Sequence, residues 1–287
     1  MSLSDVRVSG WTAEAAQADE TDALESGNVL FCRDLRFEVA RDEMPLFTPA
    51  ILGRAKNTSF DPGSGRLGGT TLSGSEADAL SRMMRRFSDA AAGLVDALCP
   101  IYRDRRVRGR ASFRPAEIAG RASSWRKDDT RLHVDSFPAT PTGGRRILRV
   151  FSNVNPEGRA RTWRVGGDFE AIARRFTALL KPPLPGAGHL LALLRVTKSP
   201  RTPYDALMLQ LHDRMKADDE FQATTEQTRV EFPSGSTWLC FTDQVGHAAM
   251  AGQYQLEQTF LLPIDAMNDP QRSPLRVLER LKGRTLA

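Results

Sequence analysis

His133 and Asp135 stand two positions apart in the segment Arg131-Leu132-His133-Val134-Asp135. If this segment is a β-strand, both side chains project from one face, because side chains alternate along a strand. An imidazole nitrogen and a carboxylate oxygen can then reach the same metal ion. Two histidines and one carboxylate leave three octahedral positions open, which is the arrangement of non-haem Fe(II) oxygenases. A His-x-Asp tripeptide is also common by chance, so its surroundings must decide.

The third ligand must come from His189, His212 or His247, the only other histidines. His189 begins an apolar helical run after Pro-Gly-Ala-Gly, and His212 lies in a predicted helix that starts at Pro203. Each of these histidines is explained by packing against a helix or by a position on a helix surface. His247 follows a β-rich run and a short loop, so we predict His133, Asp135 and His247 as the Fe(II) ligands.

Composition indicates a globular protein of 287 residues with 40% hydrophobic residues. The first thirty residues contain no apolar run typical of a secretory signal, and the apolar segment Leu190–Leu194 is too short to span a bilayer. The three cysteines, Cys32, Cys99 and Cys240, are odd in number and widely spaced. This favours reduced thiols in a cytoplasmic protein.

The net charge is +5, and most basic residues are arginine. The densest run is 103–110, which could meet nucleic acid, an anionic membrane surface or an acidic sugar, or form a solvated loop. Aromatic residues do not interleave with it, and no RNA-binding signature accompanies it. We therefore expect no nucleic-acid role.

The hydrophobic pattern divides the chain into β blocks and a helical insertion. We predict a mobile segment over 1–28, a strand over 29–39, and a flexible lid or linker over the glycine-rich residues 61–74. A helix over 75–98 follows, with Ser75 and Asp78 as a capping box. Strands are predicted within 111–155, a helical insertion over about 168–218, and further strands at 230–232, 237–241 and 255–262. Residues 264–287 are predicted to be a tail or peripheral helix.

This order predicts a mainly β protein with flanking helices, folded as a double-stranded β-helix, which is a jelly-roll or cupin-like barrel. Residues 29–263 would form one domain. His133 and Asp135 lie on the first β block and His247 on the second, and such a barrel brings ligands from distant strands together in its mouth.

Five segments resemble the hydroxylases of Kdo, 3-deoxy-D-manno-oct-2-ulosonic acid, the acidic sugar that joins lipid A to the lipopolysaccharide core. They are residues 112–121, 125–135, 144–151, 163–166 and 232–263. The resemblance implies an Fe(II)- and 2-oxoglutarate-dependent dioxygenase that hydroxylates C3 of Kdo in Kdo-lipid A. The products would be Ko, succinate and CO2, with O2 as the second cosubstrate.

One departure concerns the cation that holds the distal carboxylate of 2-oxoglutarate. Many oxygenases of this class carry an arginine about ten residues after the distal histidine, but Glu257-Gln258-Thr259 offers none. Another branch places a lysine on the strand after His-x-Asp, and Gly144-Arg145-Arg146 matches that spacing with arginine. Arginine can bind a carboxylate with two parallel hydrogen bonds. We predict Arg146, with Arg149 as the second choice because alternation puts it on the opposite face.

The implied substrate is an anionic glycolipid, so further arginines are predicted to bind it. The candidates are Arg114, Arg126 and Arg131, of which Arg131 would share the face of His133 and Asp135 in a regular strand. The run 103–110 could hold the protein at the anionic cytoplasmic face of the inner membrane.

Two other functions stay open. The same iron site could serve a 2-oxoglutarate oxygenase with another substrate, such as an amino acid or a protein side chain. The chain could also be a non-catalytic, cupin-like sugar-binding protein, although cupin sites use more histidines than are available here. The sequence leaves the oligomeric state open.

Overall fold

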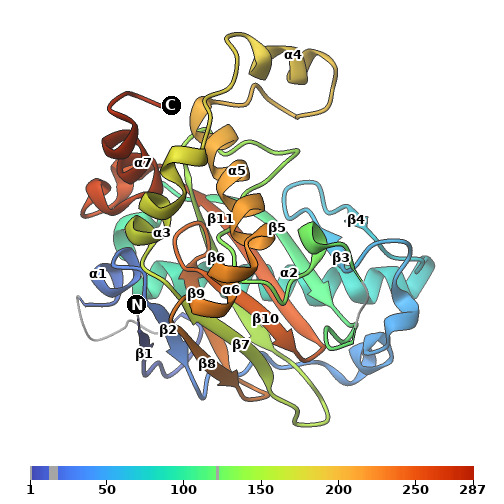
Figure 1. Ribbon diagram of the computed structural model, residues 1–287. Helices are drawn as coiled ribbons and strands as arrows, with labels where there is room; N and C mark the ends of the chain where they lie inside the picture. The colour runs from blue at the N-terminus through green and yellow to red at the C-terminus, as the bar shows by residue number, and fades with distance from the viewer. Residues whose placement is uncertain (1, 13–18, 121–122) are drawn as a thin grey trace.

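Two β-sheets face each other across the centre of the protein (Figure 1). The structure is a computed structural model that describes residues 2–12, 19–120 and 123–287. Part of the predicted N-terminal segment and Arg121, at the end of one segment of the family resemblance, lie outside the described residues. The eight-stranded sheet has the order β1-β2-β9-β6-β11-β5-β3-β4, and the three-stranded sheet has the order β10-β7-β8.

The strands of the large sheet are antiparallel to their neighbours except for the parallel pair β1 and β2. Their bounds are β1 Leu3–Asp5, β2 Val29–Cys32, β3 Thr58–Phe60, β4 Leu67–Gly68, β5 Val107–Arg114, β6 Arg146–Asn153, β9 Thr237–Phe241 and β11 Gln255–Leu262. The small sheet is antiparallel and consists of β7 Arg161–Gly166, β8 Gln227–Phe232 and β10 His247–Ala251.

Aromatic side chains fill the space between the two sheets. Phe151 and Trp238 come from the large sheet, and Trp163 and Phe232 come from the small one. The rings of Phe232 and Trp238 stack with centroids 3.9 Å apart, and Trp163 meets Trp238 edge to face. These contacts fix the separation of the sheets, because interiors are close-packed and large rings bury the most apolar area.

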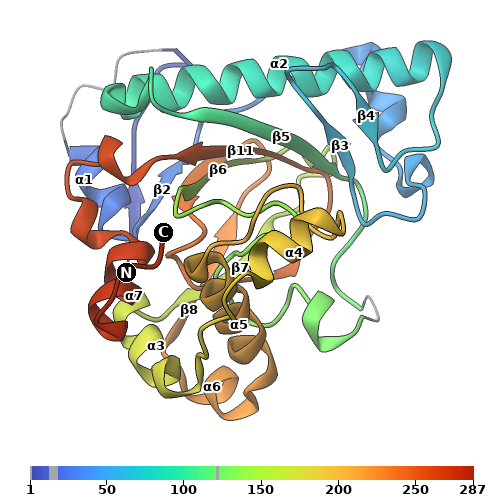
Figure 2. The ribbon, with the colours of Figure 1, turned by 90° about the horizontal axis from the view of Figure 1, so that it is seen from above.

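The outer face of the large sheet is covered by the long helix α2, Gly74–Leu98 (Figure 2). The predicted apolar stripe, which includes Leu80, Met83 and Phe87, is buried as expected. The predicted capping box is wrong: the helix begins at Gly74, and Ser73 occupies the N-cap position without a side-chain cap. Burial of the apolar stripe therefore stabilises this helix more than capping of its first turn does.

A second group of helices packs around one end of the small sheet. Four of them, α3 (Phe169–Phe176), α5 (Pro203–Ala217), α6 (Asp219–Thr224) and α7 (Pro274–Lys282), share one hydrophobic cluster. Asp168 caps α3 by accepting a hydrogen bond from the backbone N–H of Ala171. Helices α3 and α5 thus lie among the residues of the predicted insertion, α6 follows directly, and α7 lies among the residues predicted to be a tail or peripheral helix. Helix α4, Ala187–Leu193, projects away from the other helices (Figure 1).

The N-terminal residues differ from the predicted mobile segment. Strand β1 pairs with β2, and Leu24 of helix α1 (Asp19–Glu25) is fully buried. The buried carboxylate of Glu25 accepts hydrogen bonds from the Tyr102 hydroxyl at 2.7 Å and the backbone N–H of Asn268 at 2.8 Å. Isolated buried positions of this kind leave no periodic pattern, which explains why the sequence suggested a loose segment.

Helices make up more of the structure than a mainly β protein implies, so the fold class is corrected to a mixed arrangement of sheets and helices. Within the part of the chain that the structure describes, no helix is both long and apolar enough to cross a membrane. All three cysteines are buried and free of disulfides, and burial raises the pKa of Cys32 and Cys99 to about 12.

Removing the central aromatic stack should destabilise the protein. Trp238→Ala is expected to lower the free energy of unfolding by about 3–5 kcal/mol, because it leaves a cavity between the sheets. Trp125→Ala, at a side chain that is 37% exposed, should change it by less than about 0.5 kcal/mol. Urea unfolding followed by circular dichroism measures both, and equal losses would contradict the packing described.

Candidate metal centre

The segment that carries the His-x-Asp pair lies alongside the start of β10. His133 and His247 form an isolated antiparallel bridge, with reciprocal backbone hydrogen bonds of 3.0 and 2.9 Å. The N–H of Asp135 donates to the Thr242 carbonyl at 2.7 Å. The segment is extended but forms no regular strand, so the prediction of a strand over 131–135 holds only at the bridge.

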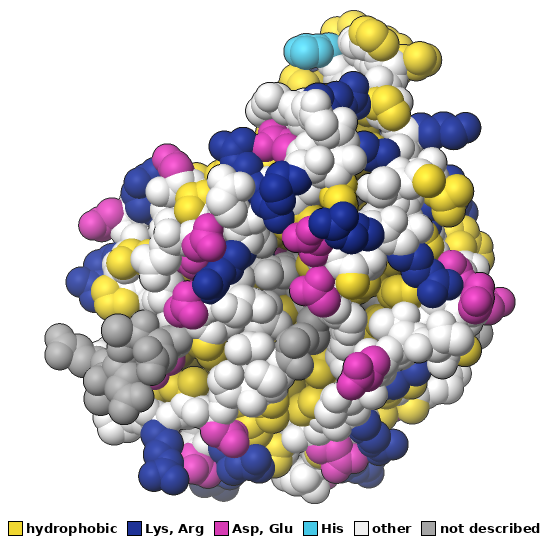
Figure 3. Space-filling view, turned by 60° about the vertical axis from the view of Figure 1, so that its left-hand side comes forward, with side chains coloured by type: hydrophobic (Ala, Val, Ile, Leu, Met, Phe, Trp, Pro, Cys, Tyr) yellow, Lys and Arg dark blue, Asp and Glu magenta, His cyan; other side chains and the backbone are white. Residues whose placement is uncertain are grey.

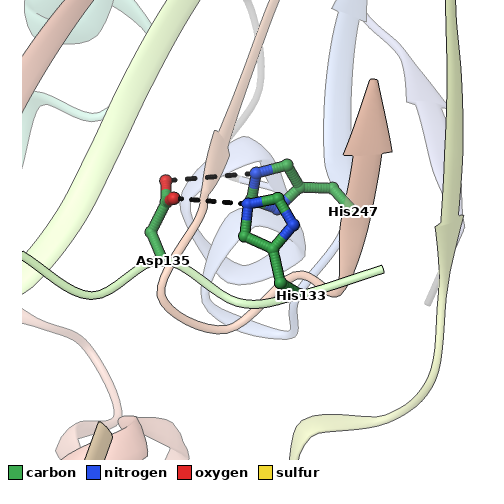
Figure 4. A group of neighbouring side chains, drawn as sticks. All are labelled: His133, Asp135 and His247. Carbon is green, nitrogen blue, oxygen red and sulfur yellow. Dashed lines mark ion pairs between the residues drawn. The ribbon is translucent and has the colours of Figure 1, made fainter. Parts of the chain in front are cut away.

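This pairing brings His133, Asp135 and His247 together, as Figure 4 shows. The Nε2 atom of His133 lies 3.8 Å from Asp135 Oδ1, and that of His247 lies 4.0 Å from Asp135 Oδ2. The possible ligand atoms of the three residues all lie within 4.8 Å of one another. The arrangement leaves a common point that three ligand atoms can reach.

Both imidazoles are oriented by their second nitrogen. Nδ1 of His133 lies 2.8 Å from the Arg131 carbonyl, and Nδ1 of His247 lies 2.8 Å from the Val245 carbonyl. A carbonyl only accepts, so each Nδ1 carries the proton and each Nε2 presents a lone pair towards Asp135. Such backbone contacts commonly fix histidine ligands of metal ions. Trp163 also stacks on the His247 ring, with centroids 5.2 Å apart.

Electrostatics prepare these side chains to bind a cation. Burial lowers the pKa of His133 well below its ordinary value, and burial also lowers the pKa of His247. Burial alone would raise the pKa of Asp135, but the neighbouring positive charge, chiefly the Arg149 guanidinium, outweighs it, so this pKa lies below its ordinary value. At neutral pH the site therefore offers two neutral imidazoles and a carboxylate.

A row of alternating charges borders the three residues. Arg149 Nη1 lies 3.3 Å from Asp135 Oδ2 and 3.0 Å from Glu257 Oε1. Glu257 Oε2 in turn accepts hydrogen bonds from Arg114 at 3.2 and 3.0 Å. Arg149, Glu257 and Arg114 lie on β6, β11 and β5, respectively. These strands are adjacent in the large sheet and direct the three side chains towards the small sheet. Arg114 and Arg149 were both predicted, in different roles.

Sequence reasoning missed Arg161 and did not single out Trp163 for this site. Both lie on β7, two positions apart, and line the same cavity as the three candidate ligands. Arg161 Nε and Trp163 Nε1 are buried and find no hydrogen-bond partner among the residues described. Burial and the nearby Arg114 lower the pKa of Arg161 to about 9. Period-two spacing of polar and aromatic side chains in Arg161–Gly166 was the available signal.

Arg146 lies away from the cavity. Its guanidinium is fully buried, pairs with Asp243 at 2.8 Å and lies over the Phe241 ring. Alternation along β6 explains this, because Leu148 and Val150 face α2 whereas Arg149 and Phe151 face the small sheet. The first choice for the distal carboxylate, Arg146, therefore lies outside the cavity with the three candidate ligands, and the second choice, Arg149, lines it.

Two predicted substrate clamps point elsewhere. Arg131 forms an ion pair with Asp219 at the start of α6, and Arg126 pairs with Asp213 on α5. Neither lines the cavity that holds His133. The shared face expected for Arg131 required a regular strand, and only the single bridge exists.

The rival histidines do not join the three candidate ligands. His189 is exposed on α4. His212 lies on α5 with its ring edge to face against His133, and its Nδ1 lies 3.0 Å from its neighbour Asp213. Neither belongs to the group of side chains whose ligand atoms converge.

The sequence profile of the 3-deoxy-D-manno-oct-2-ulosonic acid (Kdo) hydroxylases matches residues 8–285. The chain belongs to this family. Comparison with curated protein sequences finds no match.

Solved structures of the Kdo hydroxylase KdoO, a non-haem Fe(II) alphaketoglutarate-dependent dioxygenase, share the same fold. The complex of KdoO with alphaketoglutarate and Fe(III) is 43% identical, with a TM-score of 0.96, covering 100% of this chain and 98% of the other. The cobalt(II) complex is 44% identical, also with a TM-score of 0.96, covering 99% and 97%. The complex with succinate and Fe(III) is 43% identical, with a TM-score of 0.95 and the same coverage.

The residues present fit the groups named in those relatives. Two oriented imidazoles and a carboxylate suit Fe(II), and the unpartnered Nε of Arg161 and Nε1 of Trp163 are donors suited to an anionic ligand in the same cavity. This family member therefore contains three side chains that could hold a metal ion, with two unpartnered donors in the same cavity.

Loss of any one candidate ligand should abolish tight metal binding. His133→Ala, Asp135→Ala and His247→Ala are each expected to weaken Co(II) affinity by more than about 100-fold, since even outer contacts of a metal site cost 10- to 100-fold. Anaerobic calorimetric titration measures the affinity. His189→Ala, at an exposed histidine, should leave it unchanged; wild-type affinity in Asp135→Ala would remove the carboxylate from the ligand set.

Proposed function

We propose that this chain is an Fe(II)- and 2-oxoglutarate-dependent dioxygenase that hydroxylates C3 of Kdo in Kdo-lipid A. The products are Ko, succinate and CO2. The observation that carries the proposal is the convergence of His133, Asp135 and His247 in a cavity that is also lined by three arginines. Membership in the Kdo hydroxylase family supports the choice of sugar.

His133, Asp135 and His247 hold the iron in this proposal. Iron with 2-oxoglutarate and O2 supplies the oxidation of an unactivated C–H bond, which none of these acids or bases could perform. The protein's share is to orient the ligands, to keep the imidazoles neutral, and to place anionic groups beside them.

We assign the distal carboxylate of 2-oxoglutarate to Arg161, with Arg114 and Arg149 close to it. Arg161 donates through Nη1 to the Gly252 carbonyl at 2.6 Å, which fixes the guanidinium. Among the described residues it makes no ion pair, whereas Arg114 and Arg149 share Glu257. A buried guanidinium without a carboxylate is costly, so an anionic ligand would stabilise it.

The substrate fits an outer cavity that adjoins this site. A vestibule of about 540 Å³ shares Arg114, Arg149 and Glu257 with the inner cavity. Its wall adds Arg110 and Lys198, together with the hydroxyl groups of Ser112 and Thr259. Cations suit the sugar carboxylate and hydroxyls suit its polyol. Arg114 therefore remains a candidate for substrate contact, and Arg126 and Arg131 are replaced by Arg110 and Lys198.

The finer structural predictions belong to the same proposal. The two facing sheets correspond to the two halves of a double-stranded β-helix that is open at its edges, with 29–263 as one catalytic domain. A glycolipid substrate implies work at a membrane surface, and three buried thiols fit the reducing cytoplasm. The run 103–110 is a weaker membrane candidate than expected, because Arg105, Arg106 and Arg108 pair with acidic residues.

The decisive experiment follows succinate release from 2-oxoglutarate by iron-loaded protein, with and without Kdo-lipid A. We expect glycolipid-dependent succinate and one added oxygen atom on the sugar, both absent in Asp135→Ala. Succinate release independent of the glycolipid would retain the oxygenase and reject this substrate. No turnover by anaerobically prepared protein would favour a cupin-like binding protein instead.

Arg161→Gln should raise the KM for 2-oxoglutarate by about 10- to 100-fold, because a hydrogen bond to a charged group contributes about 1.5–3 kcal/mol. Steady-state kinetics at varied 2-oxoglutarate measure it, and an unchanged Co(II) affinity would show that the metal site is intact. Arg229→Gln, at an exposed arginine on the neighbouring strand β8, is the matched control. An unchanged KM in Arg161→Gln would transfer the role to Arg114 or Arg149.

A further inference from the structure

Residues 181–202, here called the arm, project from the body of the protein beside α5 and carry α4 at their tip (Figure 1). Ten large hydrophobic side chains are exposed in the described part of the chain, and five of them lie on the arm: Leu184, Leu190, Leu193, Leu194 and Val196. Leu193 is 79% exposed and Leu194 62%. Figure 3 shows hydrophobic side chains gathered on this projection. Scattered apolar residues need no explanation, but a cluster on a protrusion does.

The arm is a folded element, so its leucines are not exposed for lack of structure. Backbone hydrogen bonds join Leu194 to Leu190 and Val196 to Leu191, each at 2.9 Å. Gly188 packs so tightly against the backbone of Arg201 that any Cβ there would collide with it, which closes the neck of the arm. Leu190, Leu193 and Leu194 are spaced three and four residues apart and therefore share one side of α4.

The charge of the arm is entirely positive. It contains Lys181, Arg195, Lys198 and Arg201 and no aspartate or glutamate. Apolar side chains on one side of a short helix, flanked by cations alone, suit the boundary of an anionic bilayer, where the apolar groups enter the acyl region and the cations meet lipid phosphates. Protein interfaces, by contrast, are usually depleted in lysine.

The arm also borders the vestibule. The Lys198 N–H donates to the Ala139 carbonyl at 2.9 Å, and Arg201 Nη2 donates to the Pro138 carbonyl at 2.6 Å. Pro138, Ala139 and Lys198 all line the vestibule. The arm therefore contacts the wall of the vestibule, which adjoins the cavity of the candidate metal centre.

We propose that the arm is a membrane anchor that inserts its leucines into the surface of an anionic bilayer and holds the vestibule next to the lipid headgroups. Membrane binding itself is independent of the reaction. The purpose, delivery of a glycolipid headgroup to the vestibule, rests on the proposed function.

The test is co-sedimentation of the full chain with vesicles of phosphatidylcholine alone or mixed with phosphatidylglycerol. Wild type should bind the anionic vesicles, and Leu190→Ser/Leu193→Ser/Leu194→Ser should bind at least about tenfold more weakly. The matched control Met44→Ser/Ile101→Ser/Val107→Ser, at exposed apolar residues outside the arm, should bind like wild type. Lys181→Gln/Arg195→Gln should lose only the preference for anionic vesicles.

Activity separates this proposal from the function on which its purpose rests. All these variants should hydroxylate a deacylated Kdo oligosaccharide at the wild-type rate, while the arm variant alone fails on vesicle-embedded glycolipid. Wild type that binds neither kind of vesicle, or an arm variant that binds vesicles as tightly as wild type, would overturn the proposed anchor. The anchor would also be overturned if wild type formed a dimer that does not bind vesicles and if the serine substitutions dissociated that dimer. The arm would then bind a second copy of the chain. Failure of wild type on both the deacylated sugar and Kdo-lipid A would reject the proposed function and leave the vesicle result standing.

Discussion

The reciprocal backbone hydrogen bonds between His133 and His247 are the constraint on which the candidate metal centre depends. A shift of one residue in this pairing would turn the side chains of His133 and Asp135 to the opposite face together and separate them from His247. Two further contacts hold the register, from Asp135 N–H to the Thr242 carbonyl and from Ala249 N–H to the Asp129 carbonyl. Because β10 is held by β7, the small sheet in effect positions both halves of the ligand set.

The row of Asp135, Arg149, Glu257 and Arg114 shows how the fold supports charge in a buried place. Each of these side chains has an opposite charge within 3.3 Å. An isolated buried charge is strongly unfavourable, so loss of one member would leave its neighbours uncompensated. The pairing also fixes the direction of both guanidinium groups, because a planar fork bound to a carboxylate has little freedom.

Local sequence patterns predicted the helices, whose formation depends on the periodicity of neighbouring residues. The helix at 75–98 and the helix after Pro203 follow from apolar periodicity, and both exist with almost the expected bounds. The choice between Arg146 and Arg149 could not be made in this way. Alternation shows that they face opposite sides, but only the long-range packing of α2 decides which side faces outwards from the two sheets.

Irregular and short elements limited the rest of the prediction. Arg131 was misplaced because one bridge, rather than a strand, holds His133, and alternation does not extend beyond it. Arg161 was overlooked because only residues 163–166 of its strand were noted, as one segment of the family resemblance, and Arg161 lies just before them. The N-terminal residues gave no periodic signal, although Leu24 and Glu25 are buried. In each case the deciding contact comes from a distant part of the chain.

The charges around the inner cavity have a thermodynamic consequence for the order of assembly. The lining of this cavity carries the guanidinium groups of Arg114, Arg149 and Arg161 and the carboxylates of Asp129, Asp135 and Glu257, of which Asp129 also pairs with Lys56. A divalent cation adds two positive charges to this balance, and a dianion such as 2-oxoglutarate removes them. Each should therefore strengthen the binding of the other, and by linkage the gain in affinity must be the same in both directions. The opposite charges of the two ligands therefore make metal and cosubstrate cooperative partners.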